Sequence, residues 1–204
     1  MRKLKICLLL ATGLFLVANP GFPAEEALPK TSAVKVIFGF EEEVPSLGIP
    51  DWAFEKDDHV AKNVAISNRF ANEGRSSLEV MANFPGGKWT AAYVEVEQFF
   101  DWTPYKTVSA DIYLHKDAPF GLQARFTLSV GEDYTWVEMA RLVKLVPGEW
   151  TTISANLAPG STDWRKQQVT DEFRAGVQKL GIRIESNMRP TYSGPVYIDN
   201  VRVE

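Results

Sequence analysis

The sequence predicts an all-β protein, an antiparallel two-sheet β-sandwich (jelly roll) with one short helix near Asp171–Leu180. Its 204 residues suit a single β-domain, since such domains often reach about 200–250 residues. A hydrophobic content of 45% with 24% charged residues excludes a disordered chain, which would be poorer in apolar residues. The 14 Gly, 12 Pro and 12% aromatic residues favour many short strands joined by turns.

The N-terminus has the three parts of an export signal. Arg2, Lys3 and Lys5 form a positive region, and Ile6–Val17 is an apolar run too short to span a bilayer. Ala24 supplies a small residue after this run, so we expect a secreted or periplasmic protein, with an uncleaved anchor as the alternative. The expected organisation is a signal peptide over 1–24, a disordered lead over 25–32 and one β-sandwich over 33–204.

The leader also contains Cys7, the only cysteine of the chain. Its removal excludes a disulfide framework in the mature protein.

The position of signal cleavage stays open, because Phe22 is a poor match to the small residue usual at −3, and cleavage after Ala18 or Gly21 competes with cleavage after Ala24. The net charge of −4 becomes more negative without the basic leader, which argues against a nucleic-acid partner.

Ten runs have the alternation or the β-branched and aromatic content of strands, with turn residues between them. In the first run, Val34, Val36, Phe38 and Phe40 recur at period two, and an Asn-Glu-Gly-Arg turn at 72–75 separates the second run from the third. In order, the runs cover 34–40, 60–67, 77–82, 92–99, 108–114, 122–130, 135–143, 150–157, 180–185 and 196–203.

Two of these runs place polar side chains together. In 92–99, Val94 and Val96 lie on one face, opposite Tyr93, Glu95 and Glu97. In 122–130, alternate positions form a polar row: Gln123, Arg125, Thr127 and Ser129. A polar row of this length on a sheet face is either a solvated exterior or a binding groove.

One segment is helical in pattern. Thr170 is a capping residue followed by an acidic first turn, and Phe173, Val177 and Leu180 share one helical face. Gly181 follows as a stop signal, so the spacing predicts a helix over Asp171–Leu180.

Asp199 is the most informative polar residue, because it lies in an apolar strand-like run between Ile198 and Val201. A carboxylate in such a strand loses several kcal/mol of solvation unless it is paired or bound to a cation. One interpretation is an edge position facing water, or a pairing with Arg183 or Arg202. The other is a Ca²⁺ ligand, since Ca²⁺ takes six to eight oxygen ligands.

A series of landmarks resembles a known family. In order these are Phe38-Gly-Phe-Glu-Glu42, Glu73-Gly-Arg-Ser-Ser-Leu-Glu-Val80, Asp101-Trp-Thr-Pro-Tyr105, Val108-Ser-Ala-Asp-Ile-Tyr113, Pro147-Gly-Glu-Trp-Thr-Thr152 and Tyr197-Ile-Asp-Asn-Val201. Over residues 35–204 they look like the landmarks of calcium-containing jelly-roll carbohydrate-binding modules of the galactose-binding-domain-like superfamily.

The resemblance implies a structural Ca²⁺. Glu41 and Asp199 would be its side-chain ligands, and carbonyl groups near Arg75 would complete the site. Glu42 stands where the family often has Asp, so the three consecutive glutamates 41–43 leave the choice of ligand open.

The resemblance also directs attention to aromatic residues, since sugar rings pack on flat side chains while polar neighbours fix their hydroxyls. We expect Trp136 to be the platform, with Arg125, Gln123 and Glu138 as hydrogen-bonding partners. Arg183, Trp89 and Tyr93 would extend this face.

The other aromatic residues and the two histidines have simpler interpretations. Trp102 and Trp150 are expected to be packing residues, whereas Trp52 and Trp164 are expected in loops that cover an end of the sandwich, with ligand contact as the alternative. His59 and His115 are too few for most histidine-based zinc sites and are interpreted as surface residues.

The function these patterns favour is a secreted, non-catalytic protein that binds a poly- or oligosaccharide and acts beside a separate glycan-degrading enzyme or cell-surface protein. A secreted structural or adhesion module of the same fold is the first alternative. The second is a jelly-roll glycan-cleaving enzyme, for which Glu95, Glu97, Asp133 and Glu138 are the candidate carboxylates. The sequence contains no nucleophile elbow, phosphate loop or zinc-helix motif.

Overall fold

A computed structural model describes residues 33–42, 47–188 and 190–204. The predicted signal peptide and lead therefore lie outside the described residues. The described chain forms strands β1 (Lys35–Phe38), β2 (Ala61–Ser67), β3 (Ser77–Pro85), β4 (Trp89–Phe100), β5 (Thr107–Leu114), β6 (Leu122–Val130), β7 (Thr135–Glu138), β8 (Val143–Lys144), β9 (Trp150–Asn156), β10 (Val177–Asn187) and β11 (Thr191–Val203), with helices α1 (Asp51–Phe54) and α2 (Asp171–Ala175).

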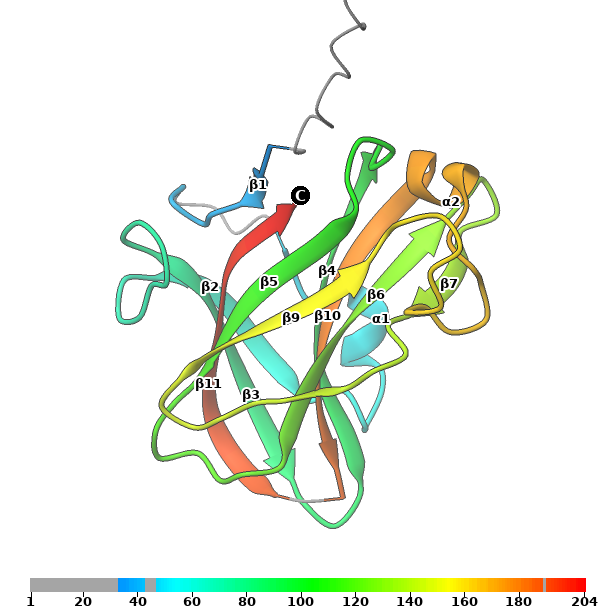
Figure 1. The fold of residues 1–204 in the computed structure, drawn as a ribbon. Helices are drawn as coiled ribbons and strands as arrows, with labels where there is room; N and C mark the ends of the chain where they lie inside the picture. Colours follow the sequence, from blue (N-terminus) through cyan, green and yellow to red (C-terminus); the bar gives the residue numbers. More distant parts are fainter. Residues whose placement is uncertain (1–32, 43–46, 189) are drawn as a thin grey trace, which may run out of the picture. The chain divides into compact units, whose positions relative to one another are not determined.

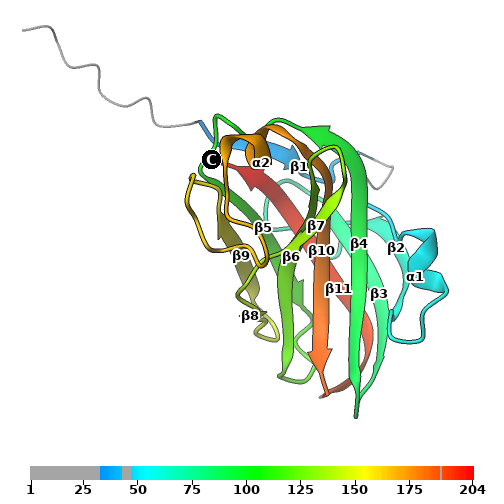
Figure 2. The ribbon, with the colours of Figure 1, turned by 90° about the vertical axis from the view of Figure 1, so that its right-hand side faces the viewer.

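The strands form two antiparallel sheets that face each other (Figures 1 and 2). The six-stranded sheet has the order β2-β3-β11-β5-β9, and β1 pairs with the far end of β11. The five-stranded sheet has the order β4-β10-β6-β7, and β8 pairs with β6. The predicted two-sheet β-sandwich is confirmed.

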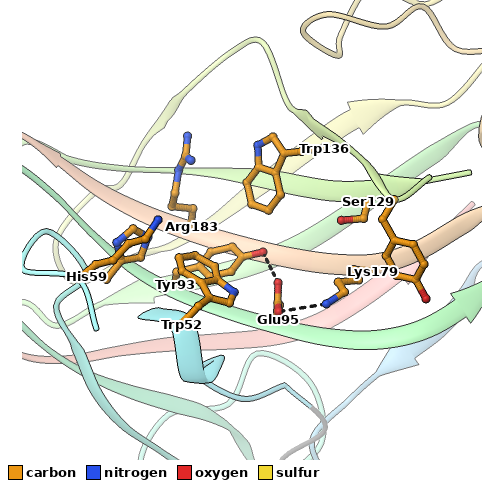
Figure 3. Close-up of a pocket in the computed structure, with 10 residues that line it drawn as sticks. Trp52, His59, Tyr93, Glu95, Ser129, Trp136, Lys179 and Arg183 are labelled. Carbon is orange, nitrogen blue, oxygen red and sulfur yellow. Dashed lines mark hydrogen bonds and ion pairs between the residues drawn. The ribbon is translucent and has the colours of Figure 1, made fainter. Parts of the chain in front are cut away.

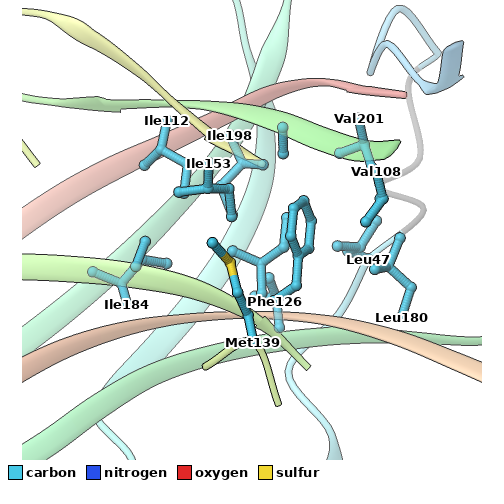
Figure 4. Packing of buried hydrophobic residues seen from close by; sticks show 14 of the residues in the cluster. Leu47, Val108, Ile112, Phe126, Met139, Ile153, Leu180, Ile184, Ile198 and Val201 are labelled. Carbon is cyan, nitrogen blue, oxygen red and sulfur yellow. The ribbon is translucent and has the colours of Figure 1, made fainter. Parts of the chain in front are cut away.

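Apolar side chains from both sheets meet in the space between them. Figure 4 shows Ile112 and Ile198 of the six-stranded sheet opposite Phe126 and Ile184 of the five-stranded sheet. All four are fully buried, and each large apolar side chain contributes about 1.5–3 kcal/mol when it leaves water. This core fixes which strand positions face inward and therefore which face outward.

Two element boundaries differ from the prediction. The helix ends at Ala175, because Val177 onward pairs with both β4 and β6, and these ladder bonds outweigh the helical spacing of the apolar residues. The run 135–143 is not one strand. Between β7 and β8 the chain leaves the sheet, and Ala140 N donates to Asp163 O (2.6 Å).

The tryptophans expected to pack do so. Trp102 is buried beside Phe100, with ring centroids 5.5 Å apart. Trp164, which the sequence places in a covering loop, is also buried and packs against Phe173. Trp150 is half-buried on the outer face of the six-stranded sheet, next to Tyr113.

Neither of the described helices is long and apolar enough to cross a membrane.

Candidate functional site

The outer face of the five-stranded sheet gathers most of the residues singled out in the sequence. Strand pairing sets them in rows across the sheet. Arg183 of β10 lies between Tyr93 of β4 and Arg125 of β6. The next rows toward α2 contain Glu95, Gly181, Thr127 and Glu138, and then Glu97, Lys179, Ser129 and Trp136. The polar faces predicted for 92–99 and 122–130 are confirmed.

A cavity of about 500 Å³ opens on this face. Its aromatic lining consists of Trp52, Tyr93, Tyr134 and Trp136. Figure 3 shows the rings of Trp52 and Trp136 on either side of the cavity. The Tyr93 ring lies 5.4 Å from Trp52 and 5.9 Å from Trp136, between centroids, so the buried Tyr93 forms the floor between two partly exposed indoles.

Gly181 makes room for this floor. A Cβ atom at residue 181 would collide with the Tyr93 hydroxyl and with Oγ1 of Thr127. Because Gly181 has no Cβ atom, the Tyr93 ring can extend across β10. The Tyr93 hydroxyl donates to Oε2 of Glu95 (2.8 Å) and lies 3.1 Å from Oγ1 of Thr127. Burial and the nearby Glu95 charge raise the pKa of Tyr93, so the hydroxyl stays protonated.

One wall of the cavity comes from the segment 47–60, which docks against the edge of β4. Gly48 and Glu95 exchange backbone hydrogen bonds (2.9 and 2.8 Å), and Val60 N donates to Ala91 O (2.8 Å). This docking brings Trp52, Lys56 and His59 to the cavity. His59 is packed 4.9 Å from the Trp52 ring and bonded to Asp58, so its interpretation as a surface residue was wrong.

Beside the cavity, three arginines and two glutamates form an ion-pair cluster, here called the arginine–glutamate cluster: Arg125, Glu138, Arg165, Arg183 and Glu185. Glu138 contacts Arg125 (3.2 Å), Arg165 (2.9 Å) and Arg183 (2.5 Å). Burial alone would raise the pKa of Glu138, but the charges of Arg183 and Arg125 outweigh it and leave the pKa below its usual range.

Glu185 is the most buried acid of the cluster. Its Oε1 lies 2.9 Å from Arg125 Nε and accepts from Arg183 Nε (2.8 Å), while its Oε2 accepts from Trp89 Nε1 (3.0 Å). The Nε–H group of Arg125 is close to Oε1 but poorly aligned with it, so the two do not form a hydrogen bond. This contact is therefore an ion pair.

The seven residues predicted to bind the ligand fall into two groups. Trp136, Tyr93 and Arg183 line the cavity. The other four lie outside its lining: Trp89, Gln123, Arg125 and Glu138. Gln123 is partly exposed and lies opposite Glu185 in the ladder.

Arg125 requires a correction. Only 3% of it is exposed, and its guanidinium contacts Glu138, Glu185 and the Met139 carbonyl. The sequence places it on the outer face but does not reveal the contacts with Glu138, Glu185 and the Met139 carbonyl that enclose it. Arg125 is therefore enclosed by protein contacts and is not exposed to a ligand.

The two predicted metal ligands, Glu41 and Asp199, both bond to the turn 72–76, which lies at one end of the six-stranded sheet. Glu41 Oε1 accepts from the amides of Arg75 (2.9 Å) and Ser76 (3.0 Å). Asp199, which is fully buried, accepts from the amides of Asn72 (2.7 Å) and Glu73 (3.0 Å). It pairs with neither Arg183 nor Arg202, since Arg202 bonds to Asp111 instead.

These oxygens agree in part with a Ca²⁺ site. Burial raises the pKa of Asp199, and the nearby charge of Glu41 raises it further. The buried Oδ1 of Asn200 has no hydrogen-bond partner. Backbone amide groups already bond to the Glu41 and Asp199 carboxylates. Among the described residues no group of three or more His, Cys, Asp or Glu side chains is arranged to hold a metal.

The fold and this face together define a β-sandwich module with an aromatic-walled cavity on one sheet. No protein-family model matches the chain, and no curated protein matches it by sequence. Solved structures do match. The carbohydrate-binding module CBM27-1 of Caldicellulosiruptor saccharolyticus, in complex with mannohexaose, has a TM-score of 0.58 and 22% identity, over 84% of this chain and 97% of that chain.

Two further structures have the same architecture. A carbohydrate-binding module specific for non-crystalline cellulose, CBM28, has a TM-score of 0.53 and 18% identity, over 69% of this chain and 80% of that one. The family 11 module of Clostridium thermocellum, with a β-1,3-1,4-mixed-linked tetrasaccharide, has a TM-score of 0.51 and 13% identity, over 83% and 94%. At these identities the likeness establishes the shared fold.

Proposed function

We propose that this chain is an exported carbohydrate-binding protein that captures a poly- or oligosaccharide in the cavity on its five-stranded sheet. The observation that carries the proposal is that Trp52, Tyr93 and Trp136 surround one cavity of about 500 Å³. The basic leader and apolar run support export. The fold shared with carbohydrate-binding modules supports the class of ligand.

In this proposal the aromatic and polar linings have different roles. A sugar ring enters between the two indoles and packs its C–H groups on them, with the Tyr93 ring below. The arginine–glutamate cluster fixes Arg183 at the edge of the cavity, so that little side-chain entropy is lost on binding. A polysaccharide offers repeated copies of the same unit, which compensates for weak binding at each one.

The alternatives lead to different observations. A structural or adhesion module would bind no glycan. A glycan-cleaving enzyme needs a carboxyl group that is protonated near neutral pH, and the lowered pKa of Glu138 makes this residue a poor proton donor. A separate glycan-degrading enzyme or cell-surface protein would act on the captured polymer.

Trp136→Ala tests the cavity. We expect it to weaken glycan binding by about tenfold or more, since a central aromatic contact is worth about 1–2 kcal/mol or more. The measurement is affinity electrophoresis and calorimetric titration over a glycan panel that includes mannohexaose and mixed-linked β-glucan. From the sequence alone, Trp52→Ala would be expected to leave binding unchanged. Because Trp52 lines the same cavity, we expect this variant to lose binding as well.

The matched control is Trp150→Ala, a half-buried tryptophan on the opposite sheet. It should leave affinity within about twofold. Equal losses for Trp136→Ala and Trp150→Ala would exclude the cavity as the site, and failure of the unmodified protein to bind any glycan would favour the adhesion module.

We also propose a structural Ca²⁺ held by Glu41 and Asp199. The raised pKa of Asp199 means that the folded state binds its proton more tightly, so ionisation of this carboxyl costs stability as the pH rises above its ordinary value of 3.8. A bound cation would offset this cost. At a concentration one hundred times its Kd it would add about 2.7 kcal/mol, or about 5–10 °C in Tm.

The measurement is the melting temperature of chelator-treated protein with and without added CaCl₂. Asp199→Asn should remove the calcium-dependent rise, whereas Glu42→Gln, an exposed neighbour, should retain it. An identical melting curve in chelator and in excess calcium would refute the metal site without affecting the glycan proposal.

A further inference from the structure

The polar lining of the cavity has an excess of positive charge. Lys56, Lys179 and Arg183 line it, against a single acid, Glu95. The chain as a whole has a net charge of −4. The cavity lining is thus positive although the whole chain is negative. A positive concave site with low-dielectric walls raises the local concentration of anionic ligands.

Lys56 is the least compensated of these cations. It is exposed and follows α1, and its Nζ lies 4.9 Å from the centroid of the Trp52 ring. No carboxylate of the described residues lies within ion-pair distance of this ammonium. Its charge therefore lies beside the Trp52 wall of the cavity and is available to a ligand.

Arg183 also has unused binding capacity. Its Nε and Nη2 contact Glu185 and Glu138, which orient the guanidinium, but its Nη1 has no hydrogen bond or ion pair among the described residues. Three arginines share two glutamates in the arginine–glutamate cluster, so the cluster keeps one positive charge beside the cavity. A fixed guanidinium suits a planar carboxylate or a sulfate.

Lys179 is placed at the other end of the cavity (Figure 3). Its Nζ contacts Glu97 (2.8 Å) and, at longer range, Glu95 (3.7 Å). The hydrogen bond with Glu97 raises the pKa of Lys179, so this ammonium remains charged. Two carboxylates therefore already neutralise this ammonium, and the uncompensated positive charge lies with Lys56 and Arg183.

From this arrangement we infer that the ligand is an acidic saccharide, whose uronate carboxylates or sulfate esters bind Lys56 and Arg183 while its ring packs between Trp52 and Trp136. This inference rests on the proposed function and specifies its ligand. The solved structures named above either contain a neutral glycan or are described as specific for one. Binding of a neutral glycan is therefore the alternative outcome.

The experiment compares polymers that differ only in charge. Alginate and polygalacturonate are titrated beside their carboxyl-reduced forms, and carrageenan beside its desulfated form, at low and high NaCl. We expect one acidic polymer to bind at least about tenfold more tightly than its neutral form and to weaken about tenfold in high salt. The pair that responds identifies carboxylate or sulfate as the recognised group.

Three charge variants test the lining. Lys56→Gln should weaken binding of the acidic polymer about three- to tenfold, and Glu95→Gln should strengthen it about threefold, because the only acid of the lining is removed. Lys144→Gln, an exposed lysine of β8 outside the cavity, should change it less than twofold. A gain of affinity is not a result that misfolding produces.

Equal affinity for acidic and neutralised polymers, or binding to neutral glycans alone, would overturn the inference and leave carbohydrate binding intact. Loss of affinity in Glu95→Gln would also overturn it. Failure to bind any polymer of either series would refute the proposed function itself, and the inference with it.

Discussion

Glu185→Ala is expected to lower the free energy of unfolding by about 3–5 kcal/mol, because removal of one member of a buried ion pair leaves its partners charged and desolvated. Arg125, which is 3% exposed, would lose the carboxylate 2.9 Å from its Nε. Trp89 Nε1 and Arg183 Nε would lose their acceptors too. Urea denaturation followed by tryptophan fluorescence measures the loss.

Arg165→Ala is the control within the same cluster. Arg165 contacts Glu138 at 2.9 Å, but half of its side chain is exposed, so we expect a loss below about 1 kcal/mol. A second comparison uses the double variant Arg125→Met with Glu185→Leu, which removes both buried charges and should lose less than Glu185→Ala alone. If Glu185→Ala proves no more harmful than Arg165→Ala, the cluster does not contribute to stability as argued.

Gly181→Ala is expected to destabilise the protein by about 1–3 kcal/mol and to abolish glycan capture, since one added methyl group overpacks the floor of the cavity. The new Cβ would meet the Tyr93 hydroxyl, and the ring would have to leave its place between Trp52 and Trp136. Chemical denaturation and glycan titration of the same preparation measure the two effects.

Gly48→Ala provides the matched control, because a Cβ there meets nothing within 4 Å. Its effect should stay within about 0.5 kcal/mol. In a Tyr93→Ala background, Gly181→Ala should cost clearly less than in the unmodified protein, as expected for two groups in direct contact. Purely additive losses would mean that the Tyr93 ring is not what occupies the space above Gly181.

Where one face of a strand meets the core and the other faces outward, the sequence was sufficient to assign both faces. Val94 and Val96 alternate with Tyr93 and Glu95, and the structure keeps this alternation because a shift by one residue would bury the carboxylate. The same argument placed Trp136 and Glu138 on the outer face. These two faces determine where the cavity lies.

Local pattern failed where long-range pairing decided the structure. Phe173, Val177 and Leu180 fit a helix, but residues 177 and 180 belong to β10, and the misassignment hid Lys179 and the role of Gly181. Positions 179, 181, 183 and 185 alternate along one strand. This alternation would have indicated that Lys179 and Gly181 lie on the same face as Arg183 and Glu185.

The contribution of Trp52, Lys56 and His59 had no such signal. They reach the cavity through backbone bonds between segment 47–60 and β4, which lie far apart in sequence. The burial of Arg125 was equally hidden, because it depends on contacts with Glu138, Met139 and Glu185, which lie elsewhere in the sequence. Sequence periodicity predicts which face a residue occupies and not what covers that face.

The pairing of β1 with β11 has a practical consequence. Lys35 lies opposite Val203 in adjacent strands of the six-stranded sheet, so both ends of the sandwich emerge side by side, on the layer that does not bear the cavity. A tether or fusion partner attached at the C-terminus would therefore continue from the sheet that contributes no described residue to the cavity. Immobilisation through the C-terminus would therefore attach the protein by the opposite sheet and leave the aromatic lining of the cavity facing the solution.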